Sequence, residues 1–341
     1  MKKIIKYFIG ILFIYFSLCF ATPFNTYLRN RSIDHQINYL SRILDKGYDN
    51  ELQSKFPEGK VFSNALLALS VIYFSEKKNC NNEKYNAIVD KCIIRLQSIE
   101  ARRKFSSQMT PKYGMFYNGW VNYVLTAYQK SKLFANSKIQ NEVLDSSSVI
   151  LERFERAQNN EPYLLDSYIG SYWPADNMIG IVTLKDAELR KNWLDTLFNS
   201  ARHDSGLIHH AASNSNEIRG SSSAMITYCL CEMDYENLSY YNNQYKNIFV
   251  DSYLGLELVK ENEDGSNHMD IDSGPVVWGY GASATIMNIK TQACLNNTNA
   301  KITWAAMNII SLPINVLNNK YYLLNKEPMF DLFMLWASVE I

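Results

Sequence analysis

The chain has 341 residues, of which 47% are hydrophobic, and its 34 lysines and arginines balance its 34 aspartates and glutamates. This composition supplies enough apolar surface for a sizeable core, in two ordinary domains or in one large repeat-like domain. The balanced charge gives no basic footprint for nucleic acid, and no P-loop, CxxC pair or dinucleotide-type glycine motif occurs. We therefore expect no nucleic-acid partner and no cofactor.

The N-terminal segment has the layout of a secretory signal. Three lysines within the first six residues precede an apolar run over residues 7–20, and Ala21 supplies a small residue at the cleavage position. The sequence thus predicts a signal peptide over residues 1–21 and export to the periplasm, the exterior or the outer face of a membrane. An uncleaved anchor is the alternative, although the run is short for a spanning helix, which needs about 20 residues.

Five cysteines follow the predicted signal, and export would permit disulfides. Cys80 and Cys92 flank a short connection and could bridge two helices. Cys229 and Cys231 lie two positions apart on a predicted helix, so they point in different directions and should not pair with each other. The odd count leaves at least one free thiol, which is more often a buried small side chain than a nucleophile.

From residue 32 onward, one segment after another shows helical periodicity, with little alternating strand pattern between them. Residues 257–260 form one short stretch with an extended pattern. No linker or low-complexity run interrupts the series, which favours a single domain over residues 22–341. The predicted helices number about twelve and cover residues 33–44, 61–75, 85–99, 115–128, 143–154, 174–184, 187–201, 221–232, 238–250, 275–289, 303–310 and 329–339.

The connections between these helices alternate in length. Those leaving the even-numbered helices are short and polar, whereas most of those entering them are long and rich in aromatic residues, glycine and proline. Long connections of this kind tend to be functional. If the helical pairs close into a ring, the even-numbered helices line its inside and the long connections gather at their N-terminal ends. These connections cover residues 105–114, 162–173, 203–220, 257–274 and 312–328.

Helix composition supports the same arrangement, because residues 65–69 are apolar nearly all round, whereas residues 141–156 carry a charged face. Alternating helices with a functional face at the inner N-termini resemble the (α/α)6 toroid, or six-hairpin fold. Glycoside hydrolases, polysaccharide lyases and the linalool dehydratase-isomerase group share this fold. Segments 172–177, 219–223 and 270–275 are similar to those of exported bacterial toroid proteins. The resemblance implies an all-α toroid over nearly the whole mature chain, but a fold alone does not decide function.

The stretch 269–285 is the most distinctive in the sequence. It begins with Asp270 and Asp272, and Pro275 then suits the first position of a helix, where a missing N–H costs nothing. Several glycines follow, and each weakens an isolated helix by roughly 1 kcal/mol relative to alanine. We expect this density to reflect the close approach of another backbone or of a ligand.

Carboxylates and histidines in the long connections are the candidate catalytic groups. Glycosidic cleavage needs two carboxyl groups on opposite sides of one bond, and Asp176 and Asp272 precede or begin different inner helices. Both could instead be helix caps, and Asp270 is a further candidate. His209 and His210 could move protons near neutral pH, or could be one exposed and one packed ring. No HExxH or comparable spacing occurs, so no metal site is expected.

Aromatic and polar residues of the same connections suit a sugar, whose C–H faces stack on rings while its hydroxyls take hydrogen bonds. Arg219 could clamp a substrate carboxylate or sulfate, or form a surface salt bridge. Asp166 could instead stabilise the turn before Gly170, and the tryptophans could belong to the core. The candidate substrate-binding residues are Tyr113, Asn118, Trp120, Asp166, Tyr172, Trp173, Asn177, Arg219, Trp278 and Tyr280.

Three functions remain open. We favour an exported carbohydrate-active enzyme, a glycoside hydrolase or else a lyase, that acts on a glycan or small-molecule substrate with Asp176 and Asp272 as its acid/base pair. The linalool dehydratase-isomerase resemblance implies instead a lyase or isomerase on a small apolar alcohol. A non-catalytic toroid that binds a glycan or peptide is the third. An open groove with exposed tryptophans would favour a polymer, and a closed apolar pocket would favour the alcohol.

Overall fold

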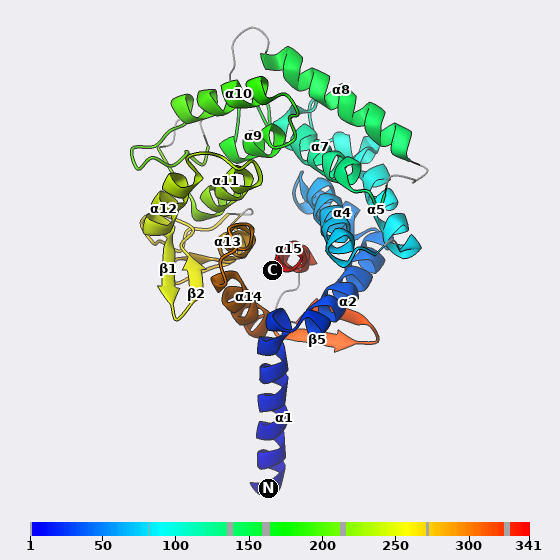
Figure 1. Ribbon diagram of the computed structural model, residues 1–341, viewed down its shortest axis with the longest axis vertical. Coiled ribbons are helices and arrows are strands. Elements are labelled where there is room, and N and C mark those ends of the chain that lie inside the picture. Colours follow the sequence, from blue (N-terminus) through cyan, green and yellow to red (C-terminus); the bar gives the residue numbers. More distant parts are fainter. Residues whose placement is uncertain are drawn as a thin grey trace.

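The computed structural model describes residues 2–80, 82–134, 139–158, 164–211, 216–270, 273–323 and 328–341. Over these residues the chain forms a ring of helices in two concentric layers (Figure 1). The N-terminal helix α1 (Lys2–Ala21) projects from the rim in the plane of the ring. The expected all-α toroid is confirmed.

The inner layer closes on itself. Each inner helix packs against the next inner helix along the chain, and the last packs against the first. Residues 114–128 of α7 are all buried, as the apolar pattern of the inner helices predicts. The inner helices are α4 (Gly59–Lys78), α7 (Gly114–Lys130), α9 (Pro174–Ile181), α11 (Gly220–Glu232), α13 (Ala282–Cys294) and α15 (Pro328–Ser338).

The outer layer covers the inner one. Each inner helix packs against the outer helix that follows it, and α15 packs against the first outer helix, which completes the circle. The outer helices are amphipathic: in α5, Val89, Cys92 and Ile93 are buried while Lys84 and Lys91 face solvent. The outer helices are α2 (Thr26–Asp45), α5 (Glu83–Leu96), α8 (Gln140–Gln158), α10 (Ala187–Ser200), α12 (Leu238–Phe249) and α14 (Asn299–Ile310).

Short elements occupy the connections. The extended pattern over residues 257–260 is confirmed by a strand, and residues 312–328, expected to be a loop, contain a hairpin. The short helices are a 3₁₀ turn (Thr22–Phe24), α3 (Tyr48–Lys55) and α6 (Ile99–Arg102). The antiparallel hairpins pair β1 (Val250–Tyr253) with β2 (Leu256–Val259), β3 (Val276–Val277) with β4 (Tyr280–Gly281), and β5 (Pro313–Val316) with β6 (Asn319–Tyr322).

The helix expected to start at Pro275 begins only at Ala282, which corrects that prediction. The β3–β4 hairpin takes its place, and its turn residues Trp278 and Gly279 have φ angles of 53° and 82°. Such angles are incompatible with a right-handed helix. A Cβ on Gly279 would lie 2.5 Å from the carbonyl oxygen of Gly265. The expected close approach of another backbone is therefore confirmed at Gly279.

The disulfide joins two neighbouring inner helices. Cys231 in α11 is bonded to Cys294, the last residue of α13. The bridge considered between Cys80 and Cys92 is wrong, because both are free and Cys92 is buried in the core. Cys229 is also a buried free thiol, and it does not pair with Cys231, as expected.

The helix α1 is apolar along most of its length. A 20-residue stretch, Ile5–Phe24, has a mean hydropathy of 1.8 and is long enough to cross a membrane. No second helix of this kind occurs in the described part of the chain. The last turns of α1 contact the ring, since the hydroxyl of Tyr15 donates a hydrogen bond to the carbonyl oxygen of Pro313 at 2.8 Å.

Candidate active site

A cavity of about 520 Å³ lies inside the ring at the N-terminal ends of the inner helices. All six inner helices contribute to its lining, and so do the connections that enter α9 and α11. This is the end of the ring at which the sequence places the long connections. The cavity is therefore the candidate active site.

The walls of the cavity are mostly apolar. Trp120 is 1% exposed and packs edge-on against Phe62, with ring centroids 5.0 Å apart. Phe116, Met225 and Phe333 line the cavity with them. Water is easily displaced from such walls, and they would accept the apolar face of a small molecule.

Two acidic residues, Asp176 and Glu58, belong to the described lining of the cavity. Asp176 lies in the first turn of α9, where the helix dipole favours a negative charge, and it accepts a hydrogen bond from the hydroxyl of Ser167 at 2.5 Å. Glu58 directly precedes α4 and accepts a hydrogen bond from the hydroxyl of Tyr168. The ring of Tyr168 stands edge-on to the ring of Trp173, and both rings line the cavity.

His210 is a neutral base inside the cavity. Its Nδ1 lies 2.6 Å from the hydroxyl of Ser222 in α11, and both residues line the cavity. Burial, followed by the positive charge of Arg219, lowers the pKa of His210 to about 4. The imidazole is therefore uncharged near pH 7 and able to accept a proton.

A charged cluster stands beside the cavity. Arg219 pairs with Asp270 and with Glu217, the latter at 2.6 Å. Burial opposes the charged form, but the carboxylates of Asp270 and Glu217 raise the pKa of Arg219. Asp270 also accepts the backbone N–H of Ser273 at 2.9 Å. This cluster ties the connection before α11 to the connection before α13.

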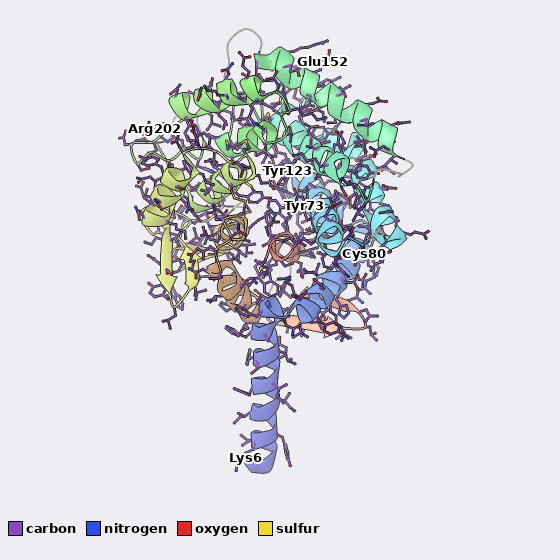
Figure 2. The ribbon with its side chains drawn as sticks, viewed as in Figure 1. Lys6, Tyr73, Cys80, Tyr123, Glu152 and Arg202 are labelled. Carbon is purple, nitrogen blue, oxygen red and sulfur yellow. A yellow bond between two sulfur atoms is a disulfide. The ribbon has the colours of Figure 1, made fainter. Side chains whose placement is uncertain are left out.

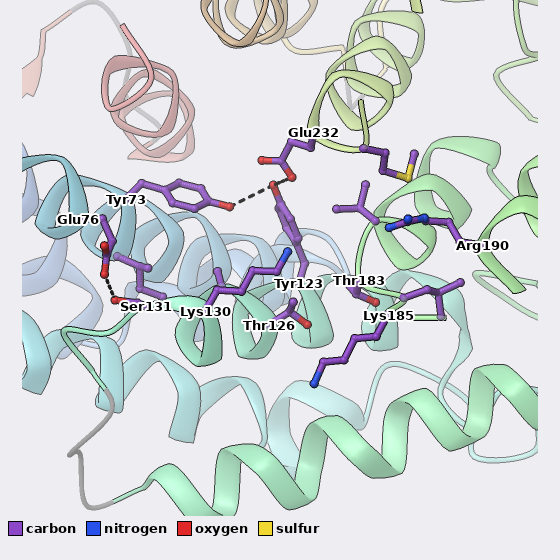
Figure 3. A pocket seen from close by; sticks show the side chains of 15 residues that line it. Tyr73, Glu76, Tyr123, Thr126, Lys130, Ser131, Thr183, Lys185, Arg190 and Glu232 are labelled. Carbon is purple, nitrogen blue, oxygen red and sulfur yellow. Dashed lines mark hydrogen bonds between the residues drawn. The ribbon is translucent and has the colours of Figure 1, made fainter. Parts of the chain in front are cut away.

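A second cavity, of about 580 Å³, opens at the opposite end of the ring, where α4, α7, α9 and α11 finish. Tyr73 and Tyr123 lie on the inner side of the ring (Figure 2), and their hydroxyls point toward each other near Glu232 (Figure 3). The hydroxyl of Tyr123 donates to Glu232 at 2.6 Å, and Tyr228 donates to the same carboxylate. Lys130 also lines this cavity. Burial and then the charge of Glu232 raise the pKa of Tyr123 well above its usual value.

An aromatic layer separates the two cavities. Trp120, which lines the first cavity, lies 6.2 Å from Tyr123, which lines the second, measured between ring centroids. Trp336 lies 5.9 Å from Trp120 and 5.7 Å from Tyr228. These four rings are buried and pack against one another between the two cavities.

No protein-family model and no curated protein matches the sequence. Solved structures do match. An unsaturated glucuronyl hydrolase from Streptococcus agalactiae aligns with a TM-score of 0.50 at 11% identity, over 81% of this chain and 80% of that one. A glycosidase in complex with glucose aligns with a TM-score of 0.51 at 9% identity, over 95% of this chain and 84% of that one. The fold is that of the helical toroid glycosidases. A family 105 glycoside hydrolase from C. acetobutylicum aligns with a TM-score of 0.48 at 10% identity, over 82% of this chain and 92% of that one.

Of the residues that the sequence singles out, the toroid brings Asp176, His210, Trp120 and Trp173 into one cavity. Asp270 and Arg219 lie beside it as an ion pair. Asp272 lies outside the described residues. The cavity thus unites four candidates that are up to 90 positions apart, from Trp120 to His210.

Other candidates hold the backbone rather than line the cavity. Asn118 is buried and donates to the carbonyl oxygens of residues 112 and 114. Asn177 is buried and exchanges hydrogen bonds with the backbone of Leu165. Asp166 accepts the N–H of Gly170 at 2.9 Å, which is the turn-stabilising role weighed for it.

The remaining candidates are spread around the same end of the ring. Tyr113 packs against Tyr117, and Tyr172 is partly buried. Trp278 is 86% exposed at the β3–β4 turn, and Tyr280 donates to Asp251 at 2.9 Å. His209 packs edge-on to the ring of His203, and burial lowers its pKa.

Sequence reasoning missed Glu58. It stands in the short connection between α3 and α4, which lacks the aromatic richness of the other connections. The one available signal was its position immediately before an inner helix. Among the described residues, no group of three or more His, Cys, Asp or Glu side chains is placed to hold a metal ion.

Proposed function

We propose that this chain is an exported acid–base enzyme of the glycoside hydrolase kind, acting on a short glycosidic substrate. The observation that carries the proposal is the cavity that holds Asp176, Glu58 and His210 at the N-terminal ends of inner helices. Acid–base cleavage needs groups that give and accept protons in one enclosed space. The structural similarity to toroid glycosidases supports a fold that can carry this chemistry.

Asp176 is the proposed general acid, with Asp272 as its partner. Asp272 precedes Gly274 and Pro275, which line the cavity, by two and three positions. Glu58 is a second acidic residue that could serve as the partner, since it lines the same cavity. His210, uncharged near pH 7, assists by accepting a proton.

The size of the cavity sets the class of substrate. A volume of about 520 Å³ falls within the range of small-molecule sites and suits one or two sugar rings. The aromatic walls would stack on the C–H face of a ring, and Trp173 beside Asp176 is placed to do so. The neighbouring glucuronyl hydrolase gives a reason to include unsaturated uronyl disaccharides among the substrates tested.

Export is part of the proposal. The apolar helix α1 fits a signal sequence over residues 1–21 or an uncleaved anchor, followed by one toroid domain over residues 22–341. The Cys231–Cys294 disulfide supports an oxidising compartment, because disulfides persist there and are rare in the cytosol.

The test compares the parent chain with Asp176→Asn, Asp272→Asn, Glu58→Gln and His210→Gln on a panel of small glycosides and unsaturated uronyl disaccharides. We expect turnover by the parent and a loss of at least roughly a hundredfold in kcat for Asp176→Asn. The partner acid is whichever of Asp272→Asn and Glu58→Gln shows a similar loss. Asp45→Asn, which alters a surface carboxylate of the outer helix α2, is the matched control. Full activity of Asp176→Asn would overturn the proposal.

The apolar walls favour one further function, a lyase or isomerase on a small alcohol. Phe62, Phe116, Met225 and Met287 offer few partners to a polyhydroxylated ring but match a hydrocarbon chain. Gas chromatography of the parent chain incubated with small tertiary and allylic alcohols tests it. Formation of an alkene or a rearranged alcohol, together with no turnover of any glycoside, would select this function over glycoside hydrolysis.

A further inference from the structure

Two hairpin turns carry a leucine where the backbone favours another residue. The β1–β2 turn consists of Leu254 and Gly255, with φ angles of 52° and 86°, and the β5–β6 turn consists of Leu317 and Asn318, with φ angles of 49° and 61°. Two-residue hairpin turns with positive φ at both positions prefer Asn, Asp or Gly, because a side chain on a left-handed residue is strained. The two leucines therefore do not stabilise the turns in which they lie.

These leucines do not serve the core either. Leu254 is fully exposed and Leu317 is 89% exposed. Val316, at the end of β5, and Ile310, at the end of α14, are more than half exposed as well. We call Leu254, Ile310, Val316 and Leu317 the apolar edge. Exposed apolar groups gathered in one region of a surface mark a place of interaction.

The apolar edge lies where α1 leaves the ring. Both hairpins and the end of α14 lie along the part of the rim from which α1 projects (Figure 1). α14 packs against α1, and the hydroxyl of Tyr15 ties α1 to the first residue of β5. The apolar edge therefore flanks, on both sides, the point at which α1 leaves the ring (Figure 1).

We propose that the apolar edge rests on the surface of a lipid bilayer that α1 crosses, with the N-terminus on the cytoplasmic side. The length and hydropathy of α1 suit a span, and the lysines at its start favour the cytoplasmic side. Neither turn carries a charged side chain, so no charge is desolvated when Leu254 and Leu317 enter the interface. Because α1 lies in the plane of the ring, this seating turns the ring axis parallel to the membrane.

The test measures depth in full-length protein inserted into lipid nanodiscs. A fluorophore is attached to Leu254→Cys or to Leu317→Cys, each in a Cys80→Ser background that removes the partly exposed native thiol. Leu144→Cys is the matched control, since Leu144 is 42% exposed on α8, across the ring from α1. Lipids with a nitroxide near the headgroup should quench positions 254 and 317 several-fold more strongly than position 144.

Two outcomes would overturn the proposal. Equal, weak quenching at all three positions would show that the edge stays in water. Protection of positions 254 and 317 from a soluble quencher without lipid quenching would assign the edge to another protein or to a second copy of this chain.

A double variant separates a membrane role from a structural one. Leu254→Asn with Leu317→Asn relieves the backbone strain, so we expect resistance to unfolding at least equal to that of the parent. A fluorophore at Val316→Cys in the same chain should lose much of its lipid quenching. Reduced stability with unchanged quenching would mean that the leucines serve the fold, and the proposal would fail.

Discussion

His210 shows how one side chain can be prepared for proton transfer by its surroundings. Its ring is buried beside Ser222 and close to the positive charge of Arg219, and both burial and that charge disfavour protonation. The cost of keeping such a residue neutral appears in the pH dependence of stability. A lowered pKa in the folded state means that the unfolded chain binds the extra proton first as the pH falls.

From a pKa of about 4 in the folded chain and about 6.5 in the unfolded chain, we expect His210 to reduce the free energy of unfolding as the pH falls from 7 to 4.5. The expected loss is about 2–3 kcal/mol, and all of it is recovered above pH 6.5. Urea denaturation of the parent and of His210→Gln at both pH values isolates this contribution. An equal pH dependence in the two proteins would contradict it.

The disulfide acts between elements, joining α11 to α13 across a 63-residue separation. Closing a loop of this length in the unfolded chain lowers its entropy, which corresponds to about 4 kcal/mol of stability as an upper value. We expect Cys231→Ser to lower the free energy of unfolding by about 2–4 kcal/mol, as measured by denaturant unfolding.

Cys80→Ser is the control for the disulfide, because Cys80 is a free and partly exposed thiol. We expect Cys80→Ser to unfold like the parent. Reduction of the parent by dithiothreitol should reproduce the effect of Cys231→Ser and leave that variant unchanged. A parent that is insensitive to reductant would refute the stabilising role.

The elements also show which features the sequence determines locally. The apolar pattern of α4 and the charged face of α8 separate inner from outer helices, and the alternation of connection lengths places the functional end of the ring. The β3–β4 hairpin was not predictable in this way, because Pro275 suits the start of a helix as well as the start of a strand. Its turn depends on the contact of Gly279 with Gly265, which are 14 positions apart.

The candidate site, like the fold, was only partly predictable from the sequence. Asp176 and His210 stand at inner-helix entrances, where the sequence pattern points. The polar side chains of Asn118 and Asn177 share those entrances but bind the backbone, and sequence alone does not distinguish the two roles. The Cys231–Cys294 pairing depends on which inner helices are neighbours, so it required the closed ring.

At the scale of the whole molecule, a buried ion pair lies where the ring closes. Lys290 of α13 is fully buried and lies 2.9 Å from the carboxylate of Glu340, just after α15. Its ammonium also lies over the rings of Tyr228 and Trp336. The backbone of Glu340 accepts a hydrogen bond from Lys77 of α4, so three inner helices meet at this point.

We expect Glu340→Gln to lower the free energy of unfolding by about 3 kcal/mol, because it leaves a buried ammonium without its counter-charge. Lys290→Met, which removes the buried charge and keeps an apolar chain of similar length, should cost less. Asp45→Asn, at a surface carboxylate that pairs with Lys91 and Arg95, is the control and should change stability by less than about 1 kcal/mol. Thermal and urea unfolding of the three variants measures these losses of stability. A smaller loss for Glu340→Gln than for Asp45→Asn would contradict the prediction.

The aromatic layer formed by Trp120, Tyr123, Tyr228 and Trp336 makes the first cavity a dead end. A molecule bound there has to enter and leave by the same mouth, so a long polymer cannot be threaded through the ring. Under the proposed function, only the end of a sugar chain could therefore reach Asp176. If the proposed glycoside hydrolysis takes place in this cavity, its size and its closed inner end would favour removal of one or two sugar units from the end of a chain over cleavage in the middle.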